Sequence, residues 1–156
     1  MRSCAWALLF ILSGDALPPL LLAGDPGGRA HYVGGTVAAL PSQSEGRINT
    51  TDEEVLFFRS NKASVRVPYR QVNTLEYGQK VNRRYISAIL ISPVLLLAKA
   101  RKHYLTLGYT DEQGRQQAMV FQVDKRHVRA VLASLEARTG RRIEYQDEEA
   151  RKAGKG

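Results

Sequence analysis

The side chains of this sequence most able to bind a ligand are basic, and they are concentrated in its middle part. Residues 59–102 carry ten Lys and Arg side chains and one carboxylate, Glu76, while the 156-residue chain has a formal net charge of +8. Guanidinium and ammonium groups gathered in this way attract anions such as the phosphates of lipids or nucleic acids. The candidate anion-binding residues are Arg66, Arg70, Lys80, Arg83, Arg84, Lys99, Arg101 and Lys102.

The later basic residues flank an apolar run, Tyr85–Ala98, which is too short to cross a bilayer in the ordinary way. The run is compatible with a helix, and Pro93 is expected to kink or end its first half. Two interpretations of segment 79–102 remain open. It can be a buried connecting helix with solvated flanks, or a segment that enters a membrane surface while its flanks pair with lipid phosphates.

The residue types used in catalysis and metal binding show no productive spacing. His31, His103 and His127 are far apart and match no metal-ligand motif, and His103 in a strand pattern indicates a satisfied structural residue. No nucleophile elbow or phosphate-binding glycine loop is present, and a lone cysteine excludes an internal disulfide or a Cys-based cluster. The acidic run 52–54 is typical of a solvated turn. We therefore expect no enzyme activity, no metal and no cofactor.

The first 29 residues are similar to a signal peptide followed by a linker. Arg2 precedes a short apolar core, Ala5–Leu12, and the small residues Gly14 and Ala16 have the spacing of a cleavage site. This pattern predicts export to the periplasm or envelope, with the leader cleaved or kept as an anchor. The alternative is a disordered tail or a wrongly assigned start.

The rest of the chain predicts a mainly β domain over residues 30–146. The alternation from Ser64 to Arg70 is the clearest strand signal. Asp124 is placed to cap a helix over 125–139, whose apolar face repeats at helical spacing before Gly140. Residues 147–156 predict a disordered charged tail. Strands are expected near 31–37, 47–50, 55–58, 64–70, 72–77, 103–109 and 117–123.

This order of about seven strands and one C-terminal amphipathic helix resembles the pleckstrin-homology-like barrels. The run Val67-Pro68-Tyr69, then Val72 and Leu75-Glu76-Tyr77, is similar to a strand pair of bacterial members and GRAM-type domains. The segments 103–106 and 135–140 are similar to uncharacterised exported bacterial proteins of that class. The resemblance covers residues 46–140. It implies a small, partly open antiparallel barrel capped by the helix, with segment 79–102 as an insertion.

The resemblance and the charge together predict a non-catalytic binding or adapter protein at the cell envelope. Phosphoinositide-binding members place basic residues in and after the first hairpin, where this chain offers Lys62, Arg66 and Arg70. The preferred partner is an anionic membrane surface contacted through segment 79–102. The alternatives are a protein partner without lipid contact and, less favoured, nucleic acid, because Tyr77 and Tyr85 alone are interleaved there as stacking groups.

Overall fold

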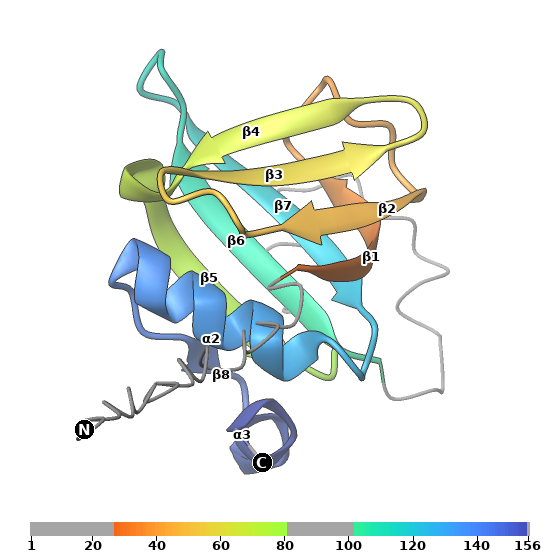
Figure 1. Ribbon diagram of the computed structural model, residues 1–156, viewed down its shortest axis with the longest axis vertical. Coiled ribbons are helices and arrows are strands. Elements are labelled where there is room, and N and C mark those ends of the chain that lie inside the picture. Colours follow the sequence, from red (N-terminus) through yellow and green to blue (C-terminus); the bar gives the residue numbers. More distant parts are fainter. Residues whose placement is uncertain (1–26, 81–101, 156) are drawn as a thin grey trace, which may run out of the picture.

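Figure 1 shows the computed structural model, which describes residues 27–80 and 102–155. This part of the chain is mainly β and ends in two α-helices, α2 (Val128–Thr139) and α3 (Glu148–Lys155). A short 3-10 helix, η1 (Tyr69–Gln71), links the fourth strand to the fifth. The strands are β1 (Gly28–Gly35), β2 (Ser44–Asn49), β3 (Val55–Ser60), β4 (Ser64–Pro68), β5 (Val72–Gly78), β6 (Tyr104–Thr110), β7 (Gln116–Val123) and β8 (Glu144–Tyr145).

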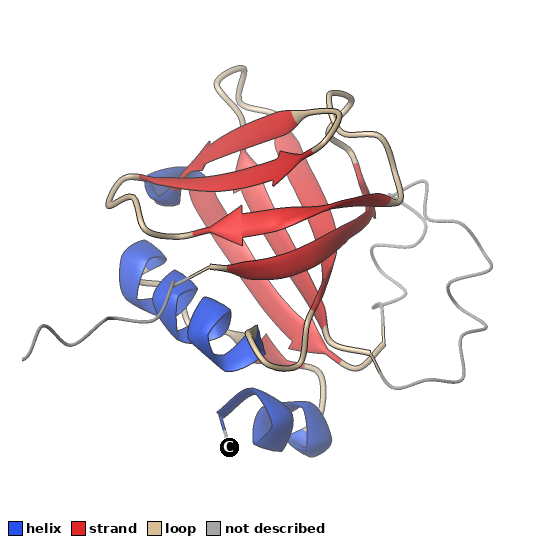
Figure 2. Ribbon diagram, turned by 45° about the vertical axis from the view of Figure 1, so that its right-hand side comes forward, coloured by secondary structure: helices blue, strands red, loops and turns tan. Residues whose placement is uncertain are grey.

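The strands of the described residues form one open, mixed sheet in the order β4-β3-β2-β1-β7-β6-β5-β8. Two antiparallel meanders, β1–β4 and β5–β7, make most of it, and the antiparallel pairing of β1 with β7 joins them. The short strand β8 pairs parallel with β5. The sheet bends over, so that β2–β4 lie across from β5–β7 with α2 at one end (Figure 2).

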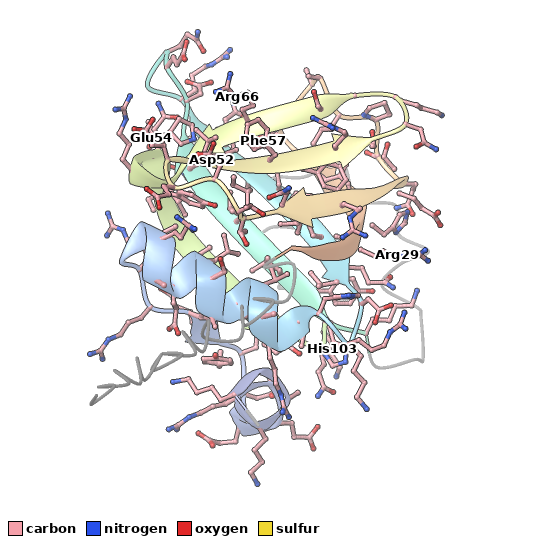
Figure 3. The ribbon with its side chains drawn as sticks, viewed as in Figure 1. Arg29, Asp52, Glu54, Phe57, Arg66 and His103 are labelled. Atoms are coloured by element: carbon pink, nitrogen blue, oxygen red, sulfur yellow. The ribbon has the colours of Figure 1, made fainter. Side chains whose placement is uncertain are left out.

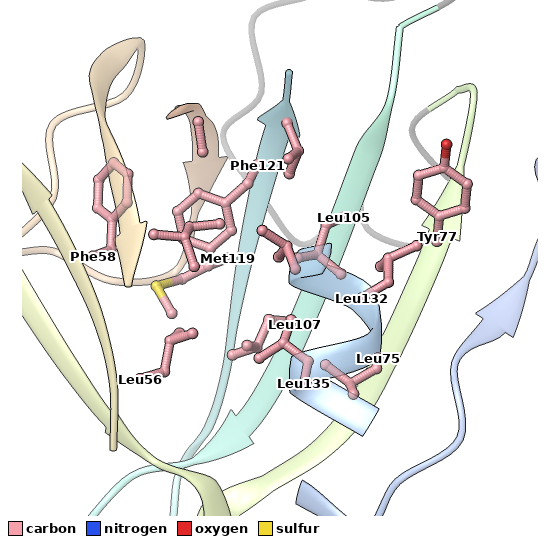
Figure 4. Close-up of a cluster of buried hydrophobic side chains, with 14 of the residues drawn as sticks. Leu56, Phe58, Leu75, Tyr77, Leu105, Leu107, Met119, Phe121, Leu132 and Leu135 are labelled. Carbon is pink, nitrogen blue, oxygen red and sulfur yellow. The ribbon is translucent and has the colours of Figure 1, made fainter. Parts of the chain in front are cut away.

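The core fills the inner face of the bent sheet. At its centre, the ring of Phe121 lies 4.9 Å from that of Phe58 and 5.7 Å from that of Tyr32, measured between centroids. Leucines of β3, β5, β6 and α2 surround these rings (Figure 4). Because side chains alternate between the two faces of a strand, the residues between these core positions point outward. The residues that fill the core therefore also decide, by alternation, which residues of each strand lie on the outer surface.

Strands β6 and β7 are buried on both faces. Leu105 and Leu107 belong to the core, yet Tyr104 and Thr106, which alternate with them, are also only 5% and 3% exposed. On β7, Val120 lies opposite Thr106 and is fully buried. The sequence predicts alternation over 103–109, and the alternation is present, but it separates two buried sides rather than a buried and a solvated side.

Helix α2 packs its apolar face onto the core as the sequence predicts, through Val128, Val131, Leu132 and Leu135. Gly140 ends it in the left-handed conformation (φ 65°), where a side chain would be strained. The predicted cap is wrong, because His127 holds the N-cap position. The Asp124 carboxylate instead accepts a hydrogen bond from the Arg126 backbone N–H at 2.9 Å, so it stabilises the turn before the helix.

Three further expectations are corrected. The sheet has eight strands within the described residues, since Glu144–Tyr145 adds a parallel edge strand next to β5. The predicted disordered tail over 147–156 contains helix α3, which buries Ala150 and Gly154. Strand β1 begins at Gly28, inside the predicted linker. The predicted leader and most of segment 79–102 fall on residues 1–26 and 81–101, outside the described residues.

Replacing Leu132, which is 2% exposed between α2 and the sheet, tests whether the helix is part of the core. Leu132→Ala is expected to lower the free energy of unfolding by about 2–4 kcal/mol, because it leaves a cavity in a packed core. Arg129→Ala, at an exposed site on the same helix, is the matched control and should change it by less than about 0.5 kcal/mol. Urea denaturation measures both values. Equal effects for the two variants would contradict this packing.

Candidate functional site

The outer face of β1, β2 and β3 carries three arginines in direct register. Arg29 of β1 lies opposite Arg47 of β2, and Arg47 lies opposite Arg59 of β3. All three side chains are exposed. Neighbouring strands are about 4.8 Å apart, so the three residues cross about 10 Å of sheet in a straight line. We call these three residues the arginine row.

The row lies in a groove of about 1020 Å³ on the sheet surface. Figure 3 shows Arg29 at the β1 side of this surface. Strands β1, β2, β3 and β7 all contribute to the groove, and polar side chains dominate its lining. The lining residues are Arg29, Ala30, His31, Glu45, Gly46, Arg47, Asn49, Phe57, Arg59, Ser60, Asn61, Gln122 and Asp124. The groove therefore combines three guanidinium groups with several neutral hydrogen-bonding groups.

Two carboxylates also line the groove, and one of them is already engaged. Asp124 forms an ion pair with Arg126 at 3.2 Å, and the hydrogen bonds from Arg126 lower the pKa of this carboxyl to about 2. Glu45 lies opposite His31, two pairs along from the Arg29–Arg47 pair and therefore on the same face of the sheet. Like charges directly opposite each other destabilise an antiparallel pair, and here the same charge occurs on three strands in succession.

Close contact between β2 and β3 keeps the arginines together. Gly46 faces Ser60 across the two strands. A Cβ atom at Gly46 would collide with the backbone oxygen of Arg59 and come within 2.8 Å of the Phe58 ring. The absence of a side chain at this position therefore lets the two strands pair beside the row while Phe58 remains in the core.

Among the predicted candidates that the structure describes, Arg66 lies nearest to the groove. It stands on β4 opposite Phe57, and its guanidinium lies 5.3 Å from the centre of the Phe57 ring, which itself lines the groove (Figure 3). This cation–π contact places Arg66 at the rim beyond β3. Arg66 extends the positive surface without joining the arginine row.

The remaining predicted residues that the structure describes lie away from the groove. Arg70 is exposed on η1 and does not line the groove. Lys80 and Lys102 each lie two residues beyond the Gly78–Tyr104 pair, at one end of β5 and β6. These candidates therefore do not form one site with Arg66. The other predicted candidates, Arg83, Arg84, Lys99 and Arg101, lie outside the described residues.

Sequence reasoning missed the arginine row. Arg29 and Arg47 fall outside the basic stretch 59–102, and Arg59 falls inside it without being a candidate. A usable signal exists in each strand, because each arginine is next to a buried core residue (Ala30, Ile48 or Phe58) and must therefore point outward. The register that aligns them across strands cannot be seen in a local pattern.

His103 is a partner of a buried tyrosine. The rings of Tyr77 and His103 stack with centroids 6.0 Å apart, and the Tyr77 hydroxyl hydrogen-bonds Nδ1 of His103. Burial raises the pKa of Tyr77 to about 12 and lowers that of His103, to which Lys125 also contributes. Because the Tyr77 phenol is protonated and the His103 imidazole is neutral, the Tyr77 hydroxyl donates this hydrogen bond and Nδ1 of His103 accepts it. This agrees with the expected structural role of His103.

The lowered pKa of His103 predicts a loss of stability in mild acid. Because the folded state resists protonation, the unfolded chain takes up the proton first as the pH falls below about 6.5. This contribution is intact above that pH and is lost as the pH falls towards the folded-state pKa. The melting temperature of wild type is therefore expected to fall between pH 7.5 and pH 5.5 by more than that of His103→Gln. Parallel pH profiles for the two proteins would contradict the assignment.

The repulsion in the arginine row predicts an unusual salt dependence of stability. Arg59→Gln removes one like-charge pair, so at low ionic strength it should raise the free energy of unfolding by about 0.2–1 kcal/mol. In 0.5 M salt the gain should disappear, because the charges are screened. Arg142→Gln, at an exposed loop position, is the charge-matched control and should give no such gain. A loss of stability in Arg59→Gln that is largest at low salt would show that the row is not repulsive.

The described residues were also compared with the requirements for a membrane-spanning helix and for a metal site. Within residues 27–80 and 102–155, no helix is long and apolar enough to span a bilayer. In the same ranges, no three His, Cys, Asp or Glu side chains lie close enough together to hold a metal ion. The chain matches no protein-family model and no curated protein. The functional proposal therefore depends on this chain's own residues and their geometry.

Proposed function

We propose that this chain is a non-catalytic binding domain that attaches to an anionic membrane surface at the cell envelope. The observation that carries the proposal is the arginine row, Arg29, Arg47 and Arg59, exposed side by side in a groove. Aligned guanidinium groups on one exposed face attract an anionic surface. The proposed surface is the outer face of β1–β4, with Arg66 at its rim.

The proposal includes a pleckstrin-homology-like arrangement for the domain. Two antiparallel meanders of four and three strands, with a helix packed at one end, support it. Strand β8 and helix α3 are additions to the pattern that the resemblance implies. In this proposal the sheet is a rigid support, and its outer side chains determine what is bound.

A membrane surface accounts for the groove better than single-stranded nucleic acid does. Recognition of single strands relies on aromatic side chains that stack with bases. Phe57 is the aromatic residue of the groove lining, and the Arg66 guanidinium already lies over its ring. Attraction of phosphates by guanidinium groups needs no stacking surface. Export, proposed from the sequence of the first 29 residues, would bring the domain to the envelope.

Vesicle sedimentation tests this proposal. The full chain is expected to pellet with vesicles containing phosphatidylglycerol and to remain in solution with neutral phosphatidylcholine vesicles, with binding weakened by 0.5 M salt. The variant R29Q/R47Q/R59Q should lose at least about fivefold in affinity, since each basic residue near an anionic surface contributes on the order of 1 kcal/mol.

The control variant is R129Q/R141Q/R142Q, which removes the same charge from exposed positions on and after α2. It should retain most of the vesicle binding, because those residues lie on a different part of the molecule. Thermal denaturation confirms that both triple variants are folded. Equal losses in the two variants would indicate a general effect of net charge, and no loss in the row variant would contradict the proposed surface. Pelleting that does not depend on lipid charge would also contradict it.

A further inference from the structure

The outer face of the sheet carries a second set of buried side chains, away from the groove. Tyr104 and Thr106 of β6 are 5% and 3% exposed, and Val120 of β7, opposite Thr106, is fully buried. Val33, at the irregular part of β1 next to Val120, is fully buried as well. The three apolar residues among them do not belong to the core cluster of the inner face. We call these four residues the outer patch.

The burial of the outer patch requires a cover. Among residues 27–80 and 102–155, the helices lie elsewhere, since α2 packs on the core and α3 contacts α2, β5 and β8. In Figure 1, β2–β4 and α2 lie in front of β6 and β7, on the side of the core. Apolar side chains are shielded from water only where other atoms contact them. Because the structure contains one chain, we infer that the cover is a part of this chain beyond the described residues.

The connection between β5 and β6 begins and ends beside the outer patch. Gly78, the last residue of β5, pairs with Tyr104, the first residue of β6 and a member of the patch. An antiparallel pair can be closed by about 2–5 residues, whereas this connection runs over residues 79–103. Residues 1–26 instead join β1 near Gly28, which lies against the side chain of His127 at the start of α2. The connection is therefore better placed than the N-terminal residues to cover the patch.

The middle of this connection has the composition that the patch requires. Most residues of the run Tyr85–Ala98 are Ala, Val, Ile or Leu, and none is charged. The four adjacent strands β5, β6, β7 and β1 span about 14 Å. Even at the rise of a helix, about 1.5 Å per residue, a run of this length reaches about 21 Å, which is enough to cross them.

From this placement we propose that the run Tyr85–Ala98 docks on the outer patch and forms a second apolar layer of the domain. The inference goes beyond the proposed function, because it assigns the run to the chain's own sheet and not to a membrane. A run inserted into a bilayer would leave Tyr104 and Val120 open to water. The arginine row then meets the anionic surface while the apolar run stays with the protein.

A nitroxide label tests the docking in the full chain. With Cys4→Ser removing the native thiol, Ser92→Cys provides one attachment point inside the run. The label is expected to broaden the backbone amide signals of Thr106 and Val120 most strongly, with weaker effects on β3 and β4. A label attached through Lys62→Cys, in the exposed β3–β4 turn, is the matched control and should spare both amides. Even broadening over all strands from the first label, or strongest broadening on another face, overturns the proposal.

A replacement variant tests the same contact without a label. A glycine-serine linker of equal length replaces residues 85–98, which keeps every charge of the chain. This variant should bind the dye anilinonaphthalene sulfonate at least about threefold more strongly than wild type, since uncovered apolar surface binds it. A chain without residues 1–26 is the control and should bind no more dye than wild type. Increased binding in that control alone, or in neither variant, overturns the proposal. If the linker variant does not fold, the label experiment decides.

Vesicle sedimentation separates this inference from the proposed surface attachment. The linker variant should pellet with phosphatidylglycerol vesicles within about twofold of wild type, because it keeps the arginine row and every other basic residue. A loss of about tenfold or more with unchanged dye binding would show that the run enters the membrane, and it overturns the docking. Retained vesicle binding in R29Q/R47Q/R59Q overturns the surface attachment instead and leaves the docking standing.

Discussion

The pairing of β1 with β7 is the interaction on which the rest of this structure depends. It joins the two meanders through strands that are far apart along the chain, and its register places Tyr32 opposite Phe121. Because strand faces alternate, the same register turns Arg29 and His31 outward. A shift of one residue would exchange the two faces, exposing the aromatic core and burying a guanidinium group. The same strand register therefore produces both the aromatic core and the groove.

In the proposed function, the outer surface of the sheet binds the partner and the inner face supplies the stability. The inner face is filled by aromatic and aliphatic side chains, and α2 covers one end of it. The arginine row lies on strands that this core holds in place. The distances between the Cα atoms of its three arginines are therefore fixed. A preformed row loses little conformational freedom in its backbone when it binds.

Elements with a strong local pattern could be predicted from the sequence. The face of α2, its end at Gly140 and the approximate positions of the first seven strands follow from periodicity and from turn residues. Two elements that depend on contacts with distant parts of the chain could not be predicted. Strand β8 has two residues and exists through its pairing with β5, and α3 buries the small residues Ala150 and Gly154, which carry almost no hydrophobic signal. The arginine row could not be predicted for the same reason, because the register between strands brings Arg29, Arg47 and Arg59 together.

The most direct test of the central claim, that the outer face of β1–β3 is the binding face, is a nuclear magnetic resonance titration that follows backbone amides and arginine Nε–H groups. On addition of small bicelles that contain phosphatidylglycerol, the largest shifts should occur at Arg29, Arg47 and Arg59, with smaller ones at His31 and Gln122. Helix α2 should remain unchanged. Shifts confined to the Lys80 and Lys102 end of the sheet, or spread evenly over all exposed arginines, would contradict the claim.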